Sequence, residues 1–384
     1  MINGIIKNAI MYLIRVIMHI FYLLPIKNRV VFIPINGNFY CNLKYIYKTL
    51  AQSEIGNKLY WIVSKKAAGY PVEVKKINLY SLKAFCYILT SRVVIFNSGI
   101  FSYIPKREQQ VFIETWHGGG AYKRCNNNFK DNPNKYEKKR RYISIKEIDY
   151  FIASCGKFIE AMKKDIGDNC NFEFLSIGMP RNDIFFKANK INNITKNIKE
   201  KYNINNTTNI VLYAPTFRKN DFVIDINIEL VLQELQNKFG GKYVFFIRAH
   251  PHIRKNIENN YNSSWFINVS DHPDMQELLC AANVLITDYS SSIWDYSLLK
   301  RPCFIYANDL KQYKTERDFH TPIHEWPFPL AQNNDELCNN IKCFNSEQFN
   351  KRVAEHLKLL GSYENGTACT ALARLILDKC NKVN

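Results

Sequence analysis

Most of this chain alternates short, continuously apolar runs with segments of helical period, and this alternation limits the fold more than any other feature. The runs are rich in β-branched and aromatic residues and too short for buried helices, so they predict strands. Strands that are apolar on both faces occur in parallel sheets covered by helices on both sides, which makes the fold class α/β. The predicted strands lie within residues 29–35, 58–64, 91–99, 110–120, 149–158, 209–218, 242–251, 282–291 and 301–309, and helical period is clear at 157–165 and 274–281.

The length of 384 residues exceeds what one hydrophobic core usually serves, so two domains are expected. The turn-like stretch at 177–186 separates two series of strands. The prediction places one Rossmann-like domain at 29–180 and a second at 181–345. The segment 346–384 has helical period and is expected to pack back on both domains.

Nearly every predicted strand ends in a cluster of polar residues. In open α/β sheets, ligands bind beyond the carboxyl ends of the strands. The first domain contributes Asn97 and His117 at such ends, and the second contributes Thr216, Arg248 and the stretch 288–290. A binding site is therefore expected at these strand ends.

Three consecutive serines follow the predicted strand 284–287, and a helix is expected to restart near Ile293. The first backbone N–H groups of a helix are unpaired and favour an anion. Ser290, Ser291 and Ser292 would then lie at a phosphate site, because their hydroxyls stand beside the unpaired N–H groups. The alternative is ordinary N-capping by one serine, but a single cap does not require three serines.

The stretch ETWHGGGAYKR (114–124) places a histidine at a strand tip, followed by three glycines. His117 could remove a proton from an attacking hydroxyl near neutral pH, and Gly118 and Gly119 let the backbone approach a ligand. The spacing excludes a Walker loop. A purely structural histidine is the alternative.

The stretch FIRAHPHIR (246–254) favours an anion over a metal. His250 and His252 have no acidic or thiolate ligands at metal spacing, and the flanking arginines would repel a cation. Arg181 lies in the turn at the domain junction. Thr216 and Arg218 follow another strand, where a plain surface turn is the alternative for Arg218.

The formal net charge of +18 favours an acidic partner, such as nucleic acid, anionic lipid or a nucleotide-linked substrate. The basic runs 65–76 and 134–146 carry no RNP, KH or helix-turn-helix pattern, so no nucleic-acid partner is predicted. They are expected to be solvated or to contact anionic lipid. Eleven cysteines without a CxxC pair indicate a reducing compartment.

Residues 1–28 form a separate apolar segment that is interrupted by Lys7, Arg15 and His19. A membrane-spanning helix needs about 20 apolar residues with few charges, and no cleavage site for a signal peptide follows. An amphipathic helix on a membrane surface is predicted. The alternative is a helix that packs on the protein's own core.

Six stretches, in order, resemble the CDP-glycerol glycerophosphotransferase family of teichoic-acid primases and polymerases, whose domain also occurs in capsule polymerases. They are TWHGGG, GMPRND, YAPTFR, RAHP, TDYSSSIWDY and PCFIYANDLKQYKTERDF, within about residues 30–325. The resemblance implies a GT-B-like fold, with two Rossmann-type domains facing across a cleft. It implies transfer of glycerol phosphate or ribitol phosphate from a CDP-alditol to a hydroxyl of a membrane-linked saccharide or polymer, with release of CMP.

The resemblance also implies roles for individual residues. His117 matches the family's candidate general base, and His250 matches the histidine assigned to the donor phosphates. Ser290 and Ser291 match the phosphate-binding serines. Arg181, Thr216 and Asp288 match further motif positions and, with Arg218 and Arg248, complete the predicted donor-binding set.

Two stretches depart from the family pattern. The chain has Gly119-Gly120 where members often have Thr-Pro after His-Gly, and it has Arg317-Asp318-Phe319 where members have Arg-Gly-Phe. Both departures affect the expected substrate more than the reaction. The predicted acceptor or loop residues are Gly118, Gly119, Lys123 and Arg317.

The expected enzyme is a phosphotransferase acting on substituted phosphate groups, peripheral on the cytoplasmic face of the cell membrane. No covalent cofactor and no protein-bound metal are predicted, since there is no DxD motif, while Mg²⁺ on the donor diphosphate stays open. One rival is a GT-B nucleotide-sugar glycosyltransferase, and another is a non-catalytic basic adaptor on membrane or RNA. The alditol, the acceptor, single or repeated transfer, and the oligomeric state stay open.

Overall fold

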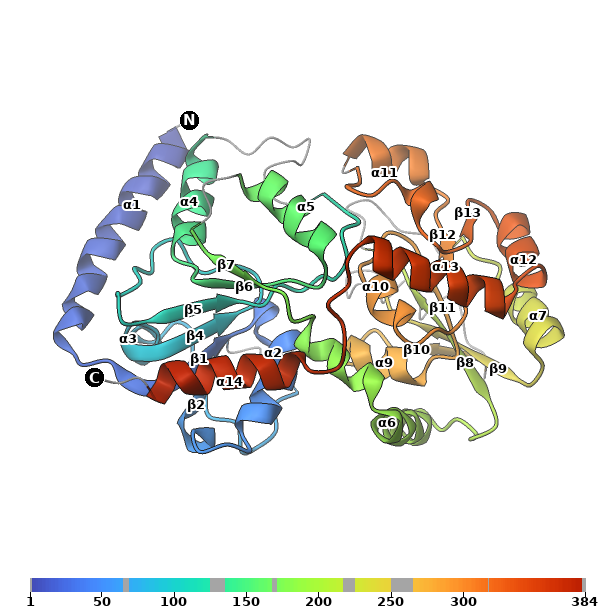
Figure 1. The fold of residues 1–384 in the computed structure, drawn as a ribbon, viewed down its shortest axis with the longest axis horizontal. Coiled ribbons are helices and arrows are strands. Elements are labelled where there is room, and N and C mark those ends of the chain that lie inside the picture. Colours follow the sequence, from blue (N-terminus) through green and yellow to red (C-terminus); the bar gives the residue numbers. More distant parts are fainter. Residues whose placement is uncertain are drawn as a thin grey trace. The chain divides into compact units, whose positions relative to one another are not determined.

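The computed structural model describes residues 2–64, 69–124, 135–167, 171–216, 225–249, 265–316 and 318–381. These residues form two compact units, each built on its own parallel sheet (Figure 1). Unit 1 comprises Met1–His117, Cys125–Asp183 and Tyr363–Asn384, and unit 2 comprises Gly118–Arg124 and Ile184–Ser362.

The sheet of unit 1 has seven parallel strands in the order β3-β2-β1-β4-β5-β6-β7. The order reverses between β1 and β4, as in a Rossmann-type sheet. Every residue of β5 is buried, so helices or loops cover both faces there. The strands are β1 (Lys27–Ile33), β2 (Leu59–Val63), β3 (Lys76–Asn78), β4 (Ser91–Phe96), β5 (Val111–Glu114), β6 (Tyr150–Ile152) and β7 (Glu173–Leu175).

Helices cover this sheet, and one of them comes from the C-terminal end of the chain (Figure 1). Leu372 and Ile376 of that helix are fully buried in the core that contains Phe32 of β1. The helices of unit 1 are α1 (Ile2–Met18), α2 (Cys41–Leu50), α3 (Leu82–Thr90), α4 (Lys135–Lys146), α5 (Gly156–Ile166) and α14 (Ala368–Asn381).

The sheet of unit 2 has six parallel strands in the order β10-β9-β8-β11-β12-β13. Its order reverses between β8 and β11, so unit 2 is also Rossmann-type. All residues of β9, β11 and β12 are buried. The strands are β8 (Asn209–Ala214), β9 (Tyr243–Ile247), β10 (Phe266–Asn268), β11 (Val284–Thr287), β12 (Cys303–Tyr306) and β13 (Leu330–Ala331).

Short polar side chains begin several helices of unit 2. Asn227 and Asp274, for example, accept the N–H groups of Leu230 and Gln276, which would otherwise be unpaired. The helices are α6 (Ala188–Lys201), α7 (Ile228–Phe239), α9 (Met275–Ala281), α10 (Ser292–Ser297), α11 (Leu310–Glu316), α12 (Asn334–Lys342) and α13 (Ser346–Leu359).

Each predicted strand run contains a strand, and the α/β class is confirmed. The prediction missed β3, β7, β10 and β13, which have only two or three residues each and too little length for a pattern. The units also differ from the predicted domains. Gly118–Arg124 belongs to unit 2, and the chain changes units at Asp183 and Ile184. The segment 346–384 is divided, with α13 in unit 2 and α14 in unit 1.

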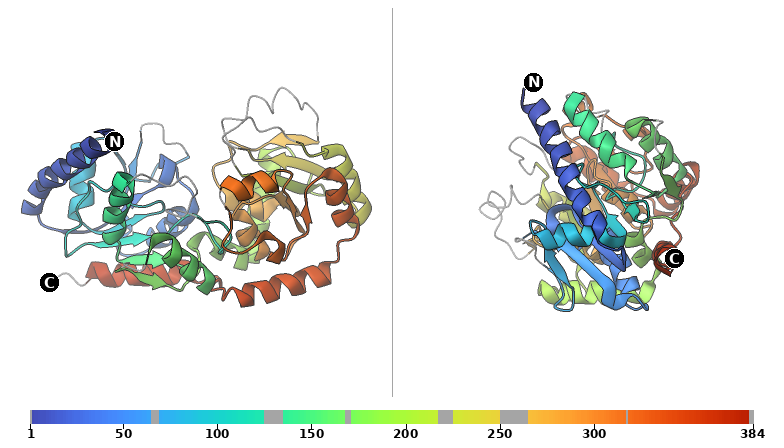
Figure 2. Two further views of the ribbon diagram at one scale, coloured as in Figure 1. Left: turned by 90° about the horizontal axis from the view of Figure 1, so that it is seen from above. Right: turned by 90° about the vertical axis from the view of Figure 1, so that its left-hand side faces the viewer.

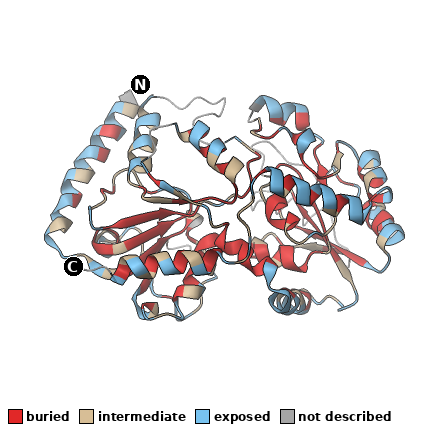
Figure 3. Ribbon diagram, viewed as in Figure 1, coloured by how far each residue is buried: buried red, intermediate tan, exposed pale blue. Residues whose placement is uncertain are grey.

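One face of the N-terminal helix α1 packs on unit 1, and the other face is exposed (Figure 2, Figure 3). Met11 and Met18 are buried, and Arg15 donates to the carbonyl of Ser102 at 2.8 Å and pairs with Glu147. Among the described residues, Gly4–Leu23 alone is long and apolar enough to cross a membrane by length and composition. The exposed apolar side chains of this segment include Ile6, Ile10, Leu13, Val16, Ile17, Ile20 and Leu23.

Candidate active site

His117 lies just beyond the carboxyl end of β5 and is exposed to solvent. Its Nδ1 atom is 2.8 Å from the carbonyl oxygen of Asn97, which follows β4. A carbonyl can only accept a hydrogen bond, so Nδ1 carries the proton and the lone pair of the neutral ring is on Nε2. The imidazole is therefore oriented and in the tautomer that a general base requires.

The backbone around His117 is held by a buried carboxyl group. Glu114, the last residue of β5, accepts the N–H of Trp116 at 2.7 Å and the N–H of Gly99. Burial raises the pKa of Glu114 to about 8, although these two N–H donors lower it. Trp116 has a left-handed backbone, with φ of 54°, which is uncommon for a bulky residue. Glu114 thus stabilises the turn that presents His117.

Arg181 is placed in unit 1, beneath the same strand end. Its backbone N–H donates to the side-chain oxygen of Asn42 at 3.1 Å, and the Asn42 amide donates to the carbonyls of Thr115 and Trp116. Arg181 is only 2% exposed, and Nη1 is 3.4 Å from the sulfur of Cys41. The prediction put Arg181 in the second domain with the donor-binding residues. The structure instead groups it with His117.

Unit 2 brings several predicted residues to the carboxyl ends of neighbouring strands. Thr216 follows β8, Arg248 follows β9, and Ser290 follows β11. Since β8 pairs with both β9 and β11, these ends are adjacent, and the reversal of strand order lies between β8 and β11. This edge is where Rossmann-type sheets bind nucleotides.

Asp288 holds this edge together. Its carboxylate accepts the N–H of Thr216 at 2.9 Å, the hydroxyl of Thr216 at 2.6 Å and the N–H of Tyr289 at 2.5 Å. Asp288 is 2% exposed. These contacts orient the loop after β8, and the donor-binding role of Asp288 stays a prediction.

The serines lie where the sequence predicts. Helix α10 begins at Ser292, and the half-buried Ser290 and Ser291 precede it. The hydroxyl of Ser290 accepts the N–H of Ser292 at 3.3 Å and its hydroxyl at 2.9 Å. Ser291 is the N-cap residue, but its side chain makes no capping hydrogen bond. Capping therefore involves Ser290 and leaves the arrangement compatible with an anion beside Ser291.

The segment Gly118–Arg124 packs within unit 2. A Cβ atom on Gly119 would lie 2.3 Å from Cδ1 of Trp294, so only glycine fits against this α10 side chain. Lys123 pairs with Phe319 in an antiparallel bridge. The segment 118–124 therefore runs beside Phe319.

Some predicted residues lie outside the described residues. They are Arg218, His250 and Arg317, together with His252, and their roles stay predictions. In turn, sequence reasoning missed Asn42, Glu114 and Tyr122. The contacts of Asn42 and Tyr122 connect segments far apart in the chain, and those of Glu114 depend on its burial at the end of β5, so no local sequence pattern predicts them.

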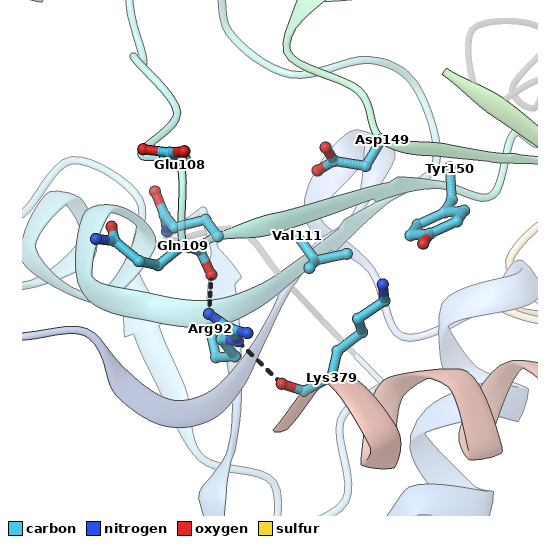
Figure 4. A pocket seen from close by; sticks show the side chains of 8 residues that line it. Arg92, Glu108, Gln109, Val111, Asp149, Tyr150 and Lys379 are labelled. Carbon is cyan, nitrogen blue, oxygen red and sulfur yellow. Dashed lines mark hydrogen bonds between the residues drawn. The ribbon is translucent and has the colours of Figure 1, made fainter. Parts of the chain in front are cut away.

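The amino-terminal edge of the unit 1 sheet carries an open hollow of about 590 Å³ (Figure 4). Arg92, at the start of β4, donates to the backbone carbonyls of Gln109 and Lys379. This hollow is at the opposite strand ends from His117, so it is separate from the candidate site. Among the described residues, no cluster of His, Cys, Asp and Glu could hold a metal ion.

Residues 16–378 match the sequence pattern of the family described as CDP-Glycerol:Poly(glycerophosphate) glycerophosphotransferase. The chain belongs to this family. The resemblance inferred from the six stretches is therefore confirmed, and the protein is a transferase of the CDP-glycerol glycerophosphotransferase type.

Other members of the glycerophosphotransferase family differ in product. The teichoic acid poly(glycerol phosphate) polymerase of Bacillus spizizenii is 27% identical over 351 residues, covering 87% of this chain and 88% of that protein. The teichoic acid ribitol-phosphate primase of the same organism is 28% identical over 313 residues, covering 77% and 78%. The wall teichoic acid polymerase TagF has the same fold, with a TM-score of 0.82 at 24% identity over 100% of this chain and 99% of that chain.

Proposed function

We propose that this protein transfers an alditol phosphate from a CDP-alditol to a hydroxyl of a membrane-linked saccharide or polymer and releases CMP. The family match over residues 16–378 is the observation that carries the proposal. Relatives that make poly(glycerol phosphate) and a ribitol phosphate linkage are similarly distant, so both CDP-glycerol and CDP-ribitol are donor candidates. CDP-glycerol is the first donor candidate, because the description of the family names CDP-glycerol and glycerophosphate transfer.

In the proposed reaction, the acceptor hydroxyl attacks the β-phosphorus while Nε2 of His117 takes its proton. A new P–O bond forms to the acceptor, and the bond from the β-phosphorus to the bridging oxygen breaks, so that CMP leaves with the electron pair. The tautomer set by Asn97 supports the base role of His117. Phosphoryl transfer depends mainly on positioning and charge neutralisation. Ser291, whose side chain makes no capping hydrogen bond, supplies a hydroxyl donor for the departing phosphate.

The chain passes from unit 1 to unit 2 directly after His117. His117 is the last residue of the first stretch of unit 1, and Gly118 begins the segment that belongs to unit 2. One peptide bond therefore joins the base to a segment whose Gly119 packs against Trp294 of α10.

We also propose that α1 lies on the cytoplasmic surface of the membrane. Its exposed apolar face would enter the lipid interface, as in amphipathic surface helices. The basic helix α4 lies beside it, with Arg140 donating to Asn8 at 2.8 Å and Lys139 over the ring of Tyr12. A spanning orientation would have to remove Arg15 from its partners Ser102 and Glu147. Anionic lipid headgroups would complement α4.

The test uses the full chain, a lipid-linked disaccharide analogue and a donor panel of CDP-glycerol, CDP-ribitol, UDP-sugars and GDP-sugars. CMP release from a CDP-alditol is expected, with and without Mg²⁺ as a further arm. Loss of the base in His117→Ala should lower kcat by roughly 10²–10⁴. The control His324→Ala removes an imidazole of unit 2 that is 73% exposed, and it should retain activity.

Each contrary outcome has a distinct meaning. Consumption of UDP- or GDP-sugars with intact CDP-alditols would replace the proposal by the glycosyltransferase alternative. Salt-sensitive binding to anionic vesicles or RNA without any turnover would favour the adaptor. Full activity of His117→Ala would remove the base assignment and leave the donor class standing.

A further inference from the structure

Tyr122 is the first large side chain in the segment that follows His117. Residues 118–121 are three glycines and an alanine, so no side chain larger than a methyl group precedes Tyr122. Tyr122 is 3% exposed within unit 2. A glycine-rich stretch has high conformational freedom, and its position must be set by the first residue that is anchored.

Tyr122 is anchored by contacts on several sides. Its hydroxyl is 3.1 Å from Nε2 of His356 on α13, and the two rings are stacked with an interplanar angle of 7°. The ring centroid of Trp326 is 4.3 Å away, and that of Trp294 is 6.2 Å away. Aromatic contacts of this kind add stability beyond the area that they bury.

The backbone beside Tyr122 is held as well. The carbonyl of Tyr122 accepts the N–H of His320 at 2.8 Å, and the carbonyl of Ala121 accepts the hydroxyl of Thr321 at 2.7 Å. Trp326 donates through Nε1 to the carbonyl of Thr321 at 2.9 Å. The ring and the backbone of the segment are therefore fastened to the same part of unit 2.

We propose that Tyr122 and His356 are positioning residues for the transfer reaction: they seat the segment 118–124 on unit 2 and so set where the chain leaves His117. This inference rests on the proposed function, since it concerns the base of that reaction. A general base must be placed within hydrogen-bond distance of the proton that it removes. A mobile segment next to the base would let the imidazole of His117 take up more positions, and this would lower kcat.

The chemistry of the pair suits a permanent anchor. Burial lowers the pKa of His356 to about 4, so the ring is neutral at physiological pH and pairs with the Tyr122 hydroxyl without a buried charge. His356 is 7% exposed and lies on α13, a helix that carries none of the predicted site residues. Its role is therefore to hold Tyr122 rather than to contact substrate.

The test compares Tyr122→Phe, His356→Leu and His356→Gln with the wild-type full chain. Tyr122→Phe keeps the ring and removes the hydroxyl, and His356→Gln keeps a side chain that can reach it. The matched control is Tyr202→Phe, because Tyr202 forms a similar pair with His272 at 3.2 Å elsewhere in unit 2. The readouts are kcat, KM and CDP-glycerol affinity, and hydrogen exchange of the peptide covering 118–124.

We expect Tyr122→Phe and His356→Leu to lower kcat roughly tenfold, with unchanged CDP-glycerol affinity. Exchange in 118–124 should rise roughly fivefold, as for the loss of one hydrogen bond. His356→Gln should recover most of kcat, and Tyr202→Phe should change neither readout. Faster exchange with wild-type kcat, or lower kcat without faster exchange, would overturn the proposal. If the wild type released no CMP, the proposed function would fail, and unchanged exchange in the variants would still reject the anchor.

Discussion

The loops of the candidate site are held by buried polar side chains that bind backbone groups. Glu114 accepts the N–H of Trp116, Asp288 accepts the N–H of Thr216, and Asn42 donates to the carbonyl of Trp116. A buried polar group that loses such a partner costs about 1–3 kcal/mol. Each loop therefore has few alternative conformations, which keeps His117 and the strand ends of unit 2 in fixed local geometries.

One added methyl group at Gly119 should lower both the stability of unit 2 and the activity. In Gly119→Ala, the new Cβ would lie 2.3 Å from the fully buried ring of Trp294. The segment would shift, and we expect unit 2 to lose about 1–3 kcal/mol and the enzyme to lose most CMP release. Thermal unfolding and turnover measure the two effects.

The control is Gly240→Ala, at a glycine with φ of 72° and ψ of 174°, a backbone conformation that essentially only glycine adopts, and with open space around it. Backbone strain there should cost about 1–3 kcal/mol, but activity should remain. Equal loss of turnover in both variants would show that stability, and not the seat of the segment, accounts for the effect.

His356 predicts how the stability of unit 2 depends on pH. Its folded-state pKa is lowered to about 4 by burial, while the unfolded value is near 6.5. The unfolded chain therefore binds the proton first as the pH falls. The stabilisation is present above pH 6.5 and is lost between pH 6.5 and 4, by roughly 3 kcal/mol.

Chemical denaturation at several pH values measures this loss. His356→Phe lacks the titrating group and should show a flatter profile over the same range. An identical slope in the wild type and in His356→Phe would mean that other groups cause the acid sensitivity.

At the scale of elements, helices α1 and α4 contribute different properties to the proposed membrane-binding surface. The exposed face of α1 is apolar, whereas α4 has no buried residue and carries six lysines and arginines between Lys135 and Lys146. Apolar insertion and attraction to anionic headgroups strengthen each other at an interface. The two helices contact each other through Arg140 and Asn8, so the two properties lie side by side.

The double variant Leu13→Asp, Val16→Asp should detach the protein from membranes without inactivating it. Both side chains are more than 60% exposed, at 61% and 68%, so the fold loses little. We expect sedimentation with anionic vesicles to fall at least tenfold, while turnover on a water-soluble acceptor analogue stays unchanged.

Leu359→Asp provides the control, because Leu359 is 81% exposed on α13 of unit 2. It should sediment with vesicles as the wild type does. Retained vesicle binding of the double variant would show that the exposed face of α1 does not carry the attachment.

At the scale of the whole molecule, the order of the chain does not follow the order of the units. The chain completes unit 2 at Ser362 and then returns to unit 1, where α14 packs against α2, β1 and β4. The carboxylate of Asp183 accepts the N–H groups of Ala368 and Cys369 at the start of α14. The first unit is therefore complete only when the last residues have been made.

Leu372→Ala should consequently destabilise unit 1, although residue 372 lies after the whole of unit 2 in the sequence. Leu372 is fully buried, and removing such a side chain costs about 2–5 kcal/mol. Hydrogen exchange should rise in β1 and β4 and stay unchanged in β8 and β11. Leu359→Ala, at an exposed site, should leave both sheets protected, and faster exchange in β8 upon Leu372→Ala would contradict the assignment of α14 to unit 1.

The predicted parts of the site are those that depend on local order. The strand at 284–287 and the helix start beside Ser291 were predicted from the apolar run and the serines, and the structure has them there. The position of Arg181 in unit 1 was not predicted, because it depends on Asn42, far away in the sequence. The same holds for Tyr122, whose partner His356 lies 234 residues later.

The sequence by itself determined the α/β class, the parallel strands, the family and the polar strand ends, because hydrophobic period and motif order are local properties of a chain. Only the tertiary structure decided the membership of Gly118–Arg124 and α14, the tautomer of His117 and the loop contacts of Asp288. Those features depend on which buried groups find a hydrogen-bond partner or a packing neighbour. Such pairings join residues remote in sequence, and only the folded chain brings them into contact.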